Sequence, residues 1–111
     1  MLSMTQATTG VEKFLLSYIY YEYGGKLYFQ NPGGDAEKFL AELFAEEFLP
    51  RKNPSFSRVA EGFAVALQGL REKGYIEIRG YELILTDNGR SLATQMRQEE
   101  YMELKKRFSR V

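Results

Sequence analysis

Residues Leu67–Ala93 read LQGLREKGYIEIRGYELILTDNGRSLA and carry the strongest signal of the fold. Gly74 marks the end of a helix, because glycine readily adopts the left-handed conformation that follows a last helical turn. Two short segments, Tyr75–Ile78 and Tyr81–Leu85, then alternate apolar and polar residues, which is typical of strands with one buried face. Since only Arg79-Gly80 separates them, the two strands are predicted to pair as a tight β-hairpin.

A helix is predicted on each side of this hairpin. Upstream, a helix begins at Asn53 or Ser55, either of which can cap it, and ends near Lys73. One side of this helix is apolar, with Val59, Phe63, Ala66, Leu67 and Leu70. Downstream, Thr86 is expected to cap one long final helix from about Asp87 to Phe108. The apolar positions of that helix spread over a broad arc and are Leu92, Ala93, Met96, Tyr101, Leu104 and Phe108.

Two further helices are predicted nearer the N-terminus. The first runs from Gly10 to about Tyr23, and Thr9 and Glu12 have the spacing of a capping box at its start. Its expected buried stripe consists of Val11, Phe14, Leu15, Tyr18 and Ile19. The second runs from Ala36 to about Phe48, with Asp35 as its cap. Its expected apolar face consists of Phe39, Leu40, Leu43, Phe44 and Phe48.

Short connections complete the first half of the chain. The segment Lys26–Gln30 is aromatic and fits a strand, whereas Asn31–Gly34 reads NPGG and predicts a turn. The segment Arg51–Ser55 predicts a polar, basic turn between the second and third helices. Residues 1–9 lack the basic and apolar regions of a signal peptide and are predicted to form a short flexible lead.

The composition restricts the chemistry that the chain can perform. Its 111 residues suit one domain, and they include no Cys and no His. Thiolate nucleophiles, the usual zinc sites and the commonest general base are therefore excluded. Asp35, Glu46 and Glu47 are the only carboxylates that suggest catalysis, and Asp35 is better explained as a helix cap. We expect a protein that is not an enzyme and that uses no metal or other cofactor.

Charge and cysteine usage bear on partners and location. The net charge is zero, but residues 1–50 carry 3 Lys/Arg against 7 Asp/Glu, and residues 51–111 carry 12 against 8. A basic second half is compatible with an anionic partner, and a solvated surface of mixed charge is the plainer explanation. The absence of Cys fits the cytoplasm, and no apolar run approaches the roughly 20 residues that span a bilayer.

The predicted order of helix, strand, helix, turn, helix, hairpin and helix resembles a winged helix-turn-helix. The stretch Leu67–Ala93 in particular looks like the matching part of MarR- and PadR-type winged-helix proteins. Those proteins leave the hairpin with a Leu-Thr-x-x-Gly-Arg pattern, as Leu85, Thr86, Gly89 and Arg90 do here. The resemblance implies a mostly helical α+β fold with a winged-helix core over residues 10–86. An extra C-terminal helix over residues 87–111 is expected to dimerise.

The resemblance also implies a function, that of a homodimeric, cytoplasmic transcriptional regulator that binds double-stranded DNA. The helix Ser55–Lys73 would enter the major groove, where Arg58 can pair with guanine and Gln68 with adenine. Serines of this helix, the preceding turn and the hairpin tip would hold the DNA backbone. The predicted DNA-binding residues are Arg51, Lys52, Ser55, Ser57, Arg58, Glu61, Gln68 and Arg79.

The final helix has two interpretations. Its pairing with a second copy predicts a dimer interface at Met96, Tyr101, Leu104 and Phe108. Alternatively, the cations Lys105, Lys106, Arg107 and Arg110 near its end simply complement the helix dipole.

Two alternatives to a DNA-binding regulator stay open. One is a winged-helix module that binds another protein without DNA, since Glu61 and Glu72 share the exposed face of the third helix with small residues. The other is a small-molecule sensor that uses aromatic space between the first and last helices. The first helix supports both, because Tyr18, Tyr20, Tyr21 and Tyr23 cannot all lie on one buried face.

Overall fold

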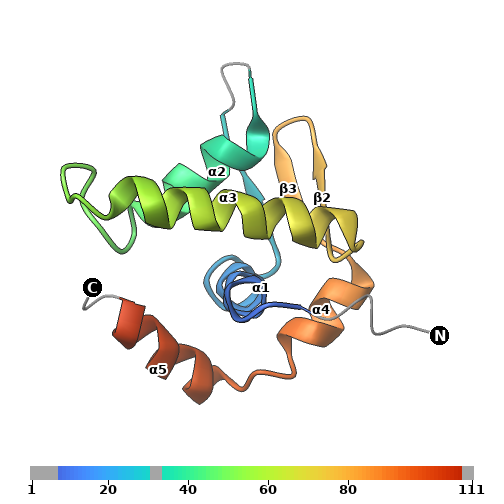
Figure 1. Ribbon diagram of the computed structural model, residues 1–111. Helices are drawn as coiled ribbons and strands as arrows, with labels where there is room; N and C mark the ends of the chain where they lie inside the picture. Colours follow the sequence, from blue (N-terminus) through green and yellow to red (C-terminus); the bar gives the residue numbers. More distant parts are fainter. Residues whose placement is uncertain (1–7, 31–33, 109–111) are drawn as a thin grey trace.

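Five helices and a three-stranded antiparallel sheet make up residues 8–30 and 34–108, which the computed structural model describes except for the side chain of Phe108 (Figure 1). The α+β, mostly helical class predicted from the sequence is confirmed. In chain order the elements are α1 (Gly10–Tyr23), β1 (Lys26–Tyr28), α2 (Ala36–Ala45), α3 (Phe56–Glu72), β2 (Ile76–Arg79), β3 (Glu82–Leu85), α4 (Asp87–Ala93) and α5 (Gln98–Phe108). Most of the predicted flexible lead and of the predicted NPGG turn lies outside the described residues.

The sheet joins the predicted hairpin to a strand from the first half of the chain. Its order is β1-β3-β2, so β3 is the central strand. Leu27 lies opposite Leu83, and both are buried, whereas Tyr28 lies opposite Glu82 on the outer face. Gly80 has a φ of 58° in the turn between β2 and β3, which glycine tolerates without strain. The outer side chains of β1 therefore lie on the same surface as those of the hairpin.

Helix α1 lies at the centre of the core. In Figure 1 it is seen end-on, with α3 on one side and α4 and α5 on the other. Every residue from Phe14 to Ile19 is buried, which confirms most of the predicted stripe. Val11 in the first turn of α1 and Leu43 in α2 are exposed instead, whereas Leu16 and Ser17, which lie off the predicted stripe, are buried because α1 is surrounded by other elements along its middle.

Local capping signals are largely confirmed. The Thr9 hydroxyl accepts from the Glu12 amide at 3.1 Å, and the Glu12 carboxylate accepts from the Thr9 amide at 2.9 Å. Asp35 likewise accepts from the amide of Lys38 and so caps α2. At the start of α3, Asn53 accepts from the amide of Ser55 at 2.8 Å, so of the two predicted caps Asn53 supplies the side-chain bond.

Two predictions about helices are wrong, one about where a helix ends and one about whether a helix is continuous. Helix α2 ends at Ala45 rather than Phe48, since the amides of Glu47 and Phe48 donate to carbonyls three residues back and tighten the chain into turns. The single final helix is broken into α4 and α5 by residues 94–97. Tyr21 donates its hydroxyl to the carbonyl of Met96 at 2.7 Å and holds this break against α1.

The break lets α5 pack back onto α1. The Tyr101 ring is fully buried and stacks on Phe14 and Tyr21, with centroids 5.8 Å and 5.5 Å away. The Tyr101 hydroxyl donates to Glu22 at 2.7 Å, and the Lys105 ammonium lies 2.6 Å from the same oxygen. A straight helix through residues 87–108 could not have made these contacts while α4 stayed against the sheet.

A close backbone approach joins the hairpin to α4. The Thr86 hydroxyl donates to the carbonyl of Gly74 at 2.7 Å and accepts from the amide of Gly89 at 3.0 Å. A Cβ atom at Gly89 would lie 2.0 Å from the carbonyl oxygen of Tyr75. The Leu-Thr-x-x-Gly pattern thus has a steric reason, since only glycine fits where α4 starts beside Tyr75. Among the described helices, none is long and apolar enough to cross a membrane.

Candidate nucleic-acid interface

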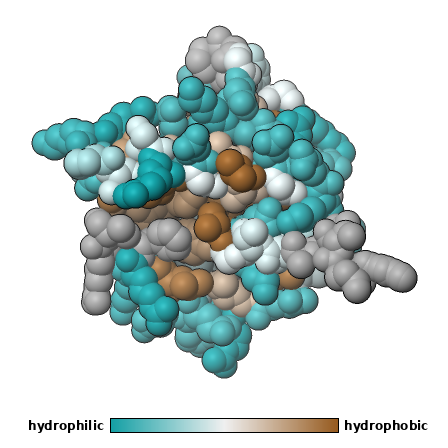
Figure 2. Space-filling view, in the orientation of Figure 1, coloured by the Kyte–Doolittle hydropathy of each residue, from teal (hydrophilic) through white to brown (hydrophobic). Residues whose placement is uncertain are grey.

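The accessible face of α3 is the surface on which the predicted DNA contacts meet. Its buried side includes Phe63, Leu67 and Leu70, which pack into the core. On the opposite side Ala64 is half-buried, and the exposed residues are Ser57, Arg58, Glu61, Val65, Gln68 and Glu72. Helix α3 crosses the front of the molecule in Figure 1, and Figure 2 shows hydrophilic residues around the rim of this view with hydrophobic ones near its middle. Val65 is among the exposed hydrophobic residues, with 65% of its surface accessible.

Two cations stand at the N-terminal end of α3 without acidic partners. Lys52 and Arg58 are exposed, and neither forms an ion pair with another of the described residues. The guanidinium of Arg58 donates to the hydroxyl of Ser55 at 3.3 Å, which keeps both groups at the entrance of the helix. This end of α3 can offer two positive charges and two hydroxyls, those of Ser55 and Ser57, to an anion.

Arg51 lies in the same turn but is already neutralised. Its Nε donates to Glu46, and its Nη1 lies 3.6 Å from Glu42. Hydrogen bonding to Glu46 raises the pKa of Arg51 above its ordinary value, and the charge of Glu42 adds to this. The guanidinium also lies over the ring of Phe56, 5.2 Å from its centroid. A phosphate would have to displace two carboxylates to bind here.

Acidic residues border the groove between α2 and α3. This open cavity of about 490 Å³ is lined by Asp35, Lys38, Glu42, Phe56, Ser57, Ala60, Glu61 and Ala64. Its floor is apolar, and its rim carries three carboxylates against one ammonium. Glu61, which was predicted to lie on the DNA-binding face, faces this groove and would repel a phosphate backbone.

In the C-terminal half of the face, Gln68 and Arg71 already bind carboxylates of the same chain. Gln68 donates to Glu72 at 3.3 Å, and Arg71 binds Glu37 of α2 at 2.8 Å. Gln68 keeps an exposed amide, but pairing with adenine requires it to leave Glu72. The structure thus brings Gln68 onto the predicted face in an already hydrogen-bonded state.

The hairpin and the neighbouring strand β1 carry one predicted contact and three residues that the sequence did not single out. Arg79 is exposed near the tip and pairs with Glu77 at 2.6 Å. Beside it, Tyr81 and Tyr28 are 63% and 71% exposed. The Lys26 ammonium lies 5.6 Å from the Tyr28 ring centroid and 3.4 Å from Glu82. Alternation in the segment Lys26–Tyr28 could have indicated its outer face, but only the pairing of β1 with β3 places it beside the hairpin.

Three of the four predicted dimer residues pack on the core of their own chain. Met96 and Leu104 are partly buried against the core, and Tyr101 is fully buried within its own chain. The side chain of Phe108 lies outside the described residues. The rings of Phe14, Tyr21 and Tyr101 stack on one another between α1 and α5, so they occupy part of the aromatic space that the sensor hypothesis assigned to a ligand.

Two of the carboxylates that the sequence suggested for catalysis have structural roles here. Asp35 is engaged as the cap of α2, and Glu46 is engaged with Arg51. Over residues 8–30 and 34–108, no group of three acidic side chains is arranged to hold a metal ion. Comparison with protein-family models, with curated proteins and with solved structures found no match, so the function of the α3 face is inferred from its own chemistry.

Proposed function

We propose that this chain is a winged helix-turn-helix DNA-binding protein, a cytoplasmic transcriptional regulator that acts as a homodimer. The observation that carries the proposal is the accessible face of α3. It has at one end two cations that pair with no carboxylate in the described part of the chain, and a β-hairpin directly after the other end. In this interpretation α2, the turn and α3 form the helix-turn-helix, and β2 and β3 form the wing.

The N-terminal end of α3 would carry the binding energy. Lys52, Ser55 and Ser57 would contact phosphates, and Arg58 would reach a base edge in the major groove. Arg79 would contact the flanking backbone after it exchanges Glu77 for a phosphate oxygen. An exposed ion pair contributes only about 0–1 kcal/mol, so the exchange costs Arg79 little. Arg51 would have to give up two carboxylates to bind a phosphate, so its exchange costs more.

A salt titration tests the proposal. The equilibrium constant for a random-sequence duplex is measured by fluorescence anisotropy over a range of sodium chloride concentrations. Each neutralised phosphate contributes about −0.9 to the slope of log K against log salt. On a random sequence Arg58 has no fixed guanine and would contact a phosphate, as Lys52 does, so the two residues predict about −1.8 per subunit and about −3.6 per dimer. Changing both residues to Ala should remove most of this slope.

Arg51→Ala is the matched control, because it removes a neighbouring cation that is already paired. We expect it to change the slope much less than the double variant does. Glu61→Gln should strengthen binding, since it removes a negative charge beside the duplex. A slope near zero for the unaltered protein, or an unchanged slope in the folded double variant, would refute the proposal.

The dimer has its own test. Leu104 is a predicted interface residue that stays partly accessible on α5, so Leu104→Glu should place a charge in the interface and produce monomers. Sedimentation equilibrium measures the change directly. An unaltered protein that is monomeric at high concentration would contradict the dimer without touching the DNA proposal.

A protein-binding module is the second candidate, and one observation favours it. The groove between α2 and α3 combines an apolar floor with an acidic rim, and Val65 is exposed nearby. Such a surface suits a basic protein segment better than a polyanion. A flat salt dependence with DNA would favour this candidate over the first.

A further inference from the structure

Ser17 is an exception in the interior of the protein. Its residue is 1% exposed, and its Oγ has no hydrogen-bond partner among residues 8–30 and 34–108. Buried hydroxyls are normally satisfied, so an unsatisfied one indicates a missing partner. The other buried polar side chain of α1 behaves differently, since Glu12 binds the Thr9 amide at 2.9 Å and the Lys73 ammonium at 2.8 Å.

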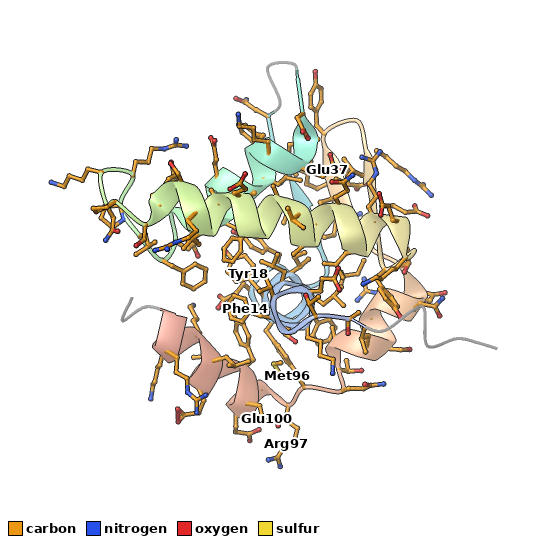
Figure 3. All side chains as sticks on the ribbon, in the orientation of Figure 1. Phe14, Tyr18, Glu37, Met96, Arg97 and Glu100 are labelled. Carbon is orange, nitrogen blue, oxygen red and sulfur yellow. The ribbon has the colours of Figure 1, made fainter. Side chains whose placement is uncertain are left out.

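Ser17 lines a cavity that the break in the last helix creates. The cavity has a volume of about 230 Å³ and lies between α1 and the α4–α5 junction, where its lining residues are Lys13, Ser17, Leu92, Gln95, Met96 and Glu100. Figure 3 shows Met96, Arg97 and Glu100 on the side of α1 opposite α3, with Met96 the closest of the three to α1. One unbroken final helix would not have provided this arrangement.

The walls of the cavity carry opposite charges. Lys13 lies one turn before Ser17 on the same face of α1 and forms no ion pair with another described residue. Glu100 comes from α5. Its Oε1 accepts from the Arg97 amide at 2.9 Å and lies 3.8 Å from Nε of the exposed Arg97 side chain, so the carboxylate is held at the start of that helix and a ligand ammonium would share it with Arg97. Leu92 and Met96 supply an apolar surface between these two charges.

We propose that this cavity binds a small zwitterion, an α-amino acid with an apolar side chain. Its carboxylate would receive hydrogen bonds from the Lys13 ammonium and the Ser17 hydroxyl, and its ammonium would face Glu100. Its side chain would pack on Leu92 and Met96. The volume fits this class, because pockets for drug-sized ligands are larger, about 300–1,000 Å³.

Two-dimensional amide NMR with each of the twenty protein-forming L-amino acids tests the site. At least one apolar amino acid should shift the amides of Ser17 and of residues 95–100 in a saturable manner. Ser17→Ala should weaken that binding about tenfold, as expected for one hydrogen bond to a charged group, while the variant stays folded. Ser91→Ala is the control, since it removes an exposed serine hydroxyl from α4 that does not line the cavity and should bind the amino acid like the unaltered protein.

Charge variants and truncated ligands test the zwitterion itself. Glu100→Gln keeps an oxygen for the Arg97 amide but removes the charge. It should therefore weaken binding of the amino acid and leave binding of the deaminated analogue unchanged. If L-leucine is the ligand, 4-methylpentanoate and 3-methylbutylamine should each bind more weakly than it does. The proposal is overturned if no amino acid binds, if the shifts map elsewhere, or if Ser17→Ala binds normally. A cavity filled by water alone would give the first of these results.

Discussion

Replacing Gly89 by Ala should destabilise the protein, because the start of α4 lies directly against the backbone of Tyr75. A Cβ at this position would meet the Tyr75 carbonyl oxygen at 2.0 Å and its carbonyl carbon at 3.0 Å. The obstacle is backbone that also accepts a hydrogen bond from the Thr86 amide at 3.1 Å. Relief of the clash therefore requires α4 to move away from the hairpin.

The magnitude follows from three contributions. Overpacking costs about 1–3 kcal/mol, and the rigid obstacle places this site near the upper end. Loss of the Thr86–Tyr75 hydrogen bond adds about 1 kcal/mol. The better helix propensity of Ala returns about 1 kcal/mol. The net expectation is a loss of about 2–3 kcal/mol in the free energy of unfolding.

Gly62→Ala is the matched control. Gly62 lies within α3, and a Cβ there would have nothing within 4 Å. The same substitution should stabilise the protein by about 0.5–1 kcal/mol through helix propensity alone. Urea denaturation followed by far-ultraviolet circular dichroism compares the midpoints of both variants with the unaltered protein. Equal midpoints for the two variants would show that α4 separates from Tyr75 at no cost, and the steric reasoning would be refuted.

Two further predictions concern the attachment of α5. Tyr101→Ala should lower the free energy of unfolding by about 3–5 kcal/mol, because it removes a fully buried ring. The neighbouring Met102 is 46% exposed, so Met102→Ala should change that free energy by no more than about 0.5 kcal/mol. Similar urea midpoints for the two variants would contradict this prediction. Hydrogen bonds from Lys105 and then Tyr101 lower the pKa of Glu22 below its ordinary 4.5, so its stabilisation is present above that pH and is lost as the pH falls through the folded pKa. Glu22→Gln should flatten this acid-induced loss of stability in urea titrations at different pH values, and an unchanged pH dependence would count against the contact.

Local sequence signals predicted the elements well. The capping box of Thr9 and Glu12, the cap at Asp35 and the two-residue hairpin turn were all found where the sequence placed them. Each of these features depends on hydrogen bonds between residues at most three positions apart. Their geometry is therefore encoded in a few neighbouring side chains and needs no knowledge of the rest of the fold.

The candidate interface was predicted less completely. The sequence placed Arg58 and Gln68 on an accessible face, but it treated Arg51 as an open cation like Lys52. Glu42 and Glu46 reach Arg51 only because α2 ends early and the chain turns back toward α3. Pairing through space decides which cations remain open to an anion, and that pairing is invisible in composition or in helical spacing.

The helical periods, the caps and the hairpin could be predicted from the amino-acid order, since these features follow from each residue and its near neighbours. The break in the last helix depends instead on contacts that are distant in the sequence. The Tyr101 ring packs on α1, and the Tyr101 hydroxyl donates to Glu22, which is 79 positions away. The same long-range packing placed Ser17 beside a cavity, with no hydrogen-bond partner for its hydroxyl in the described part of the chain. Burial and ion pairing depend on which surfaces meet in space, and a one-dimensional pattern cannot specify that meeting.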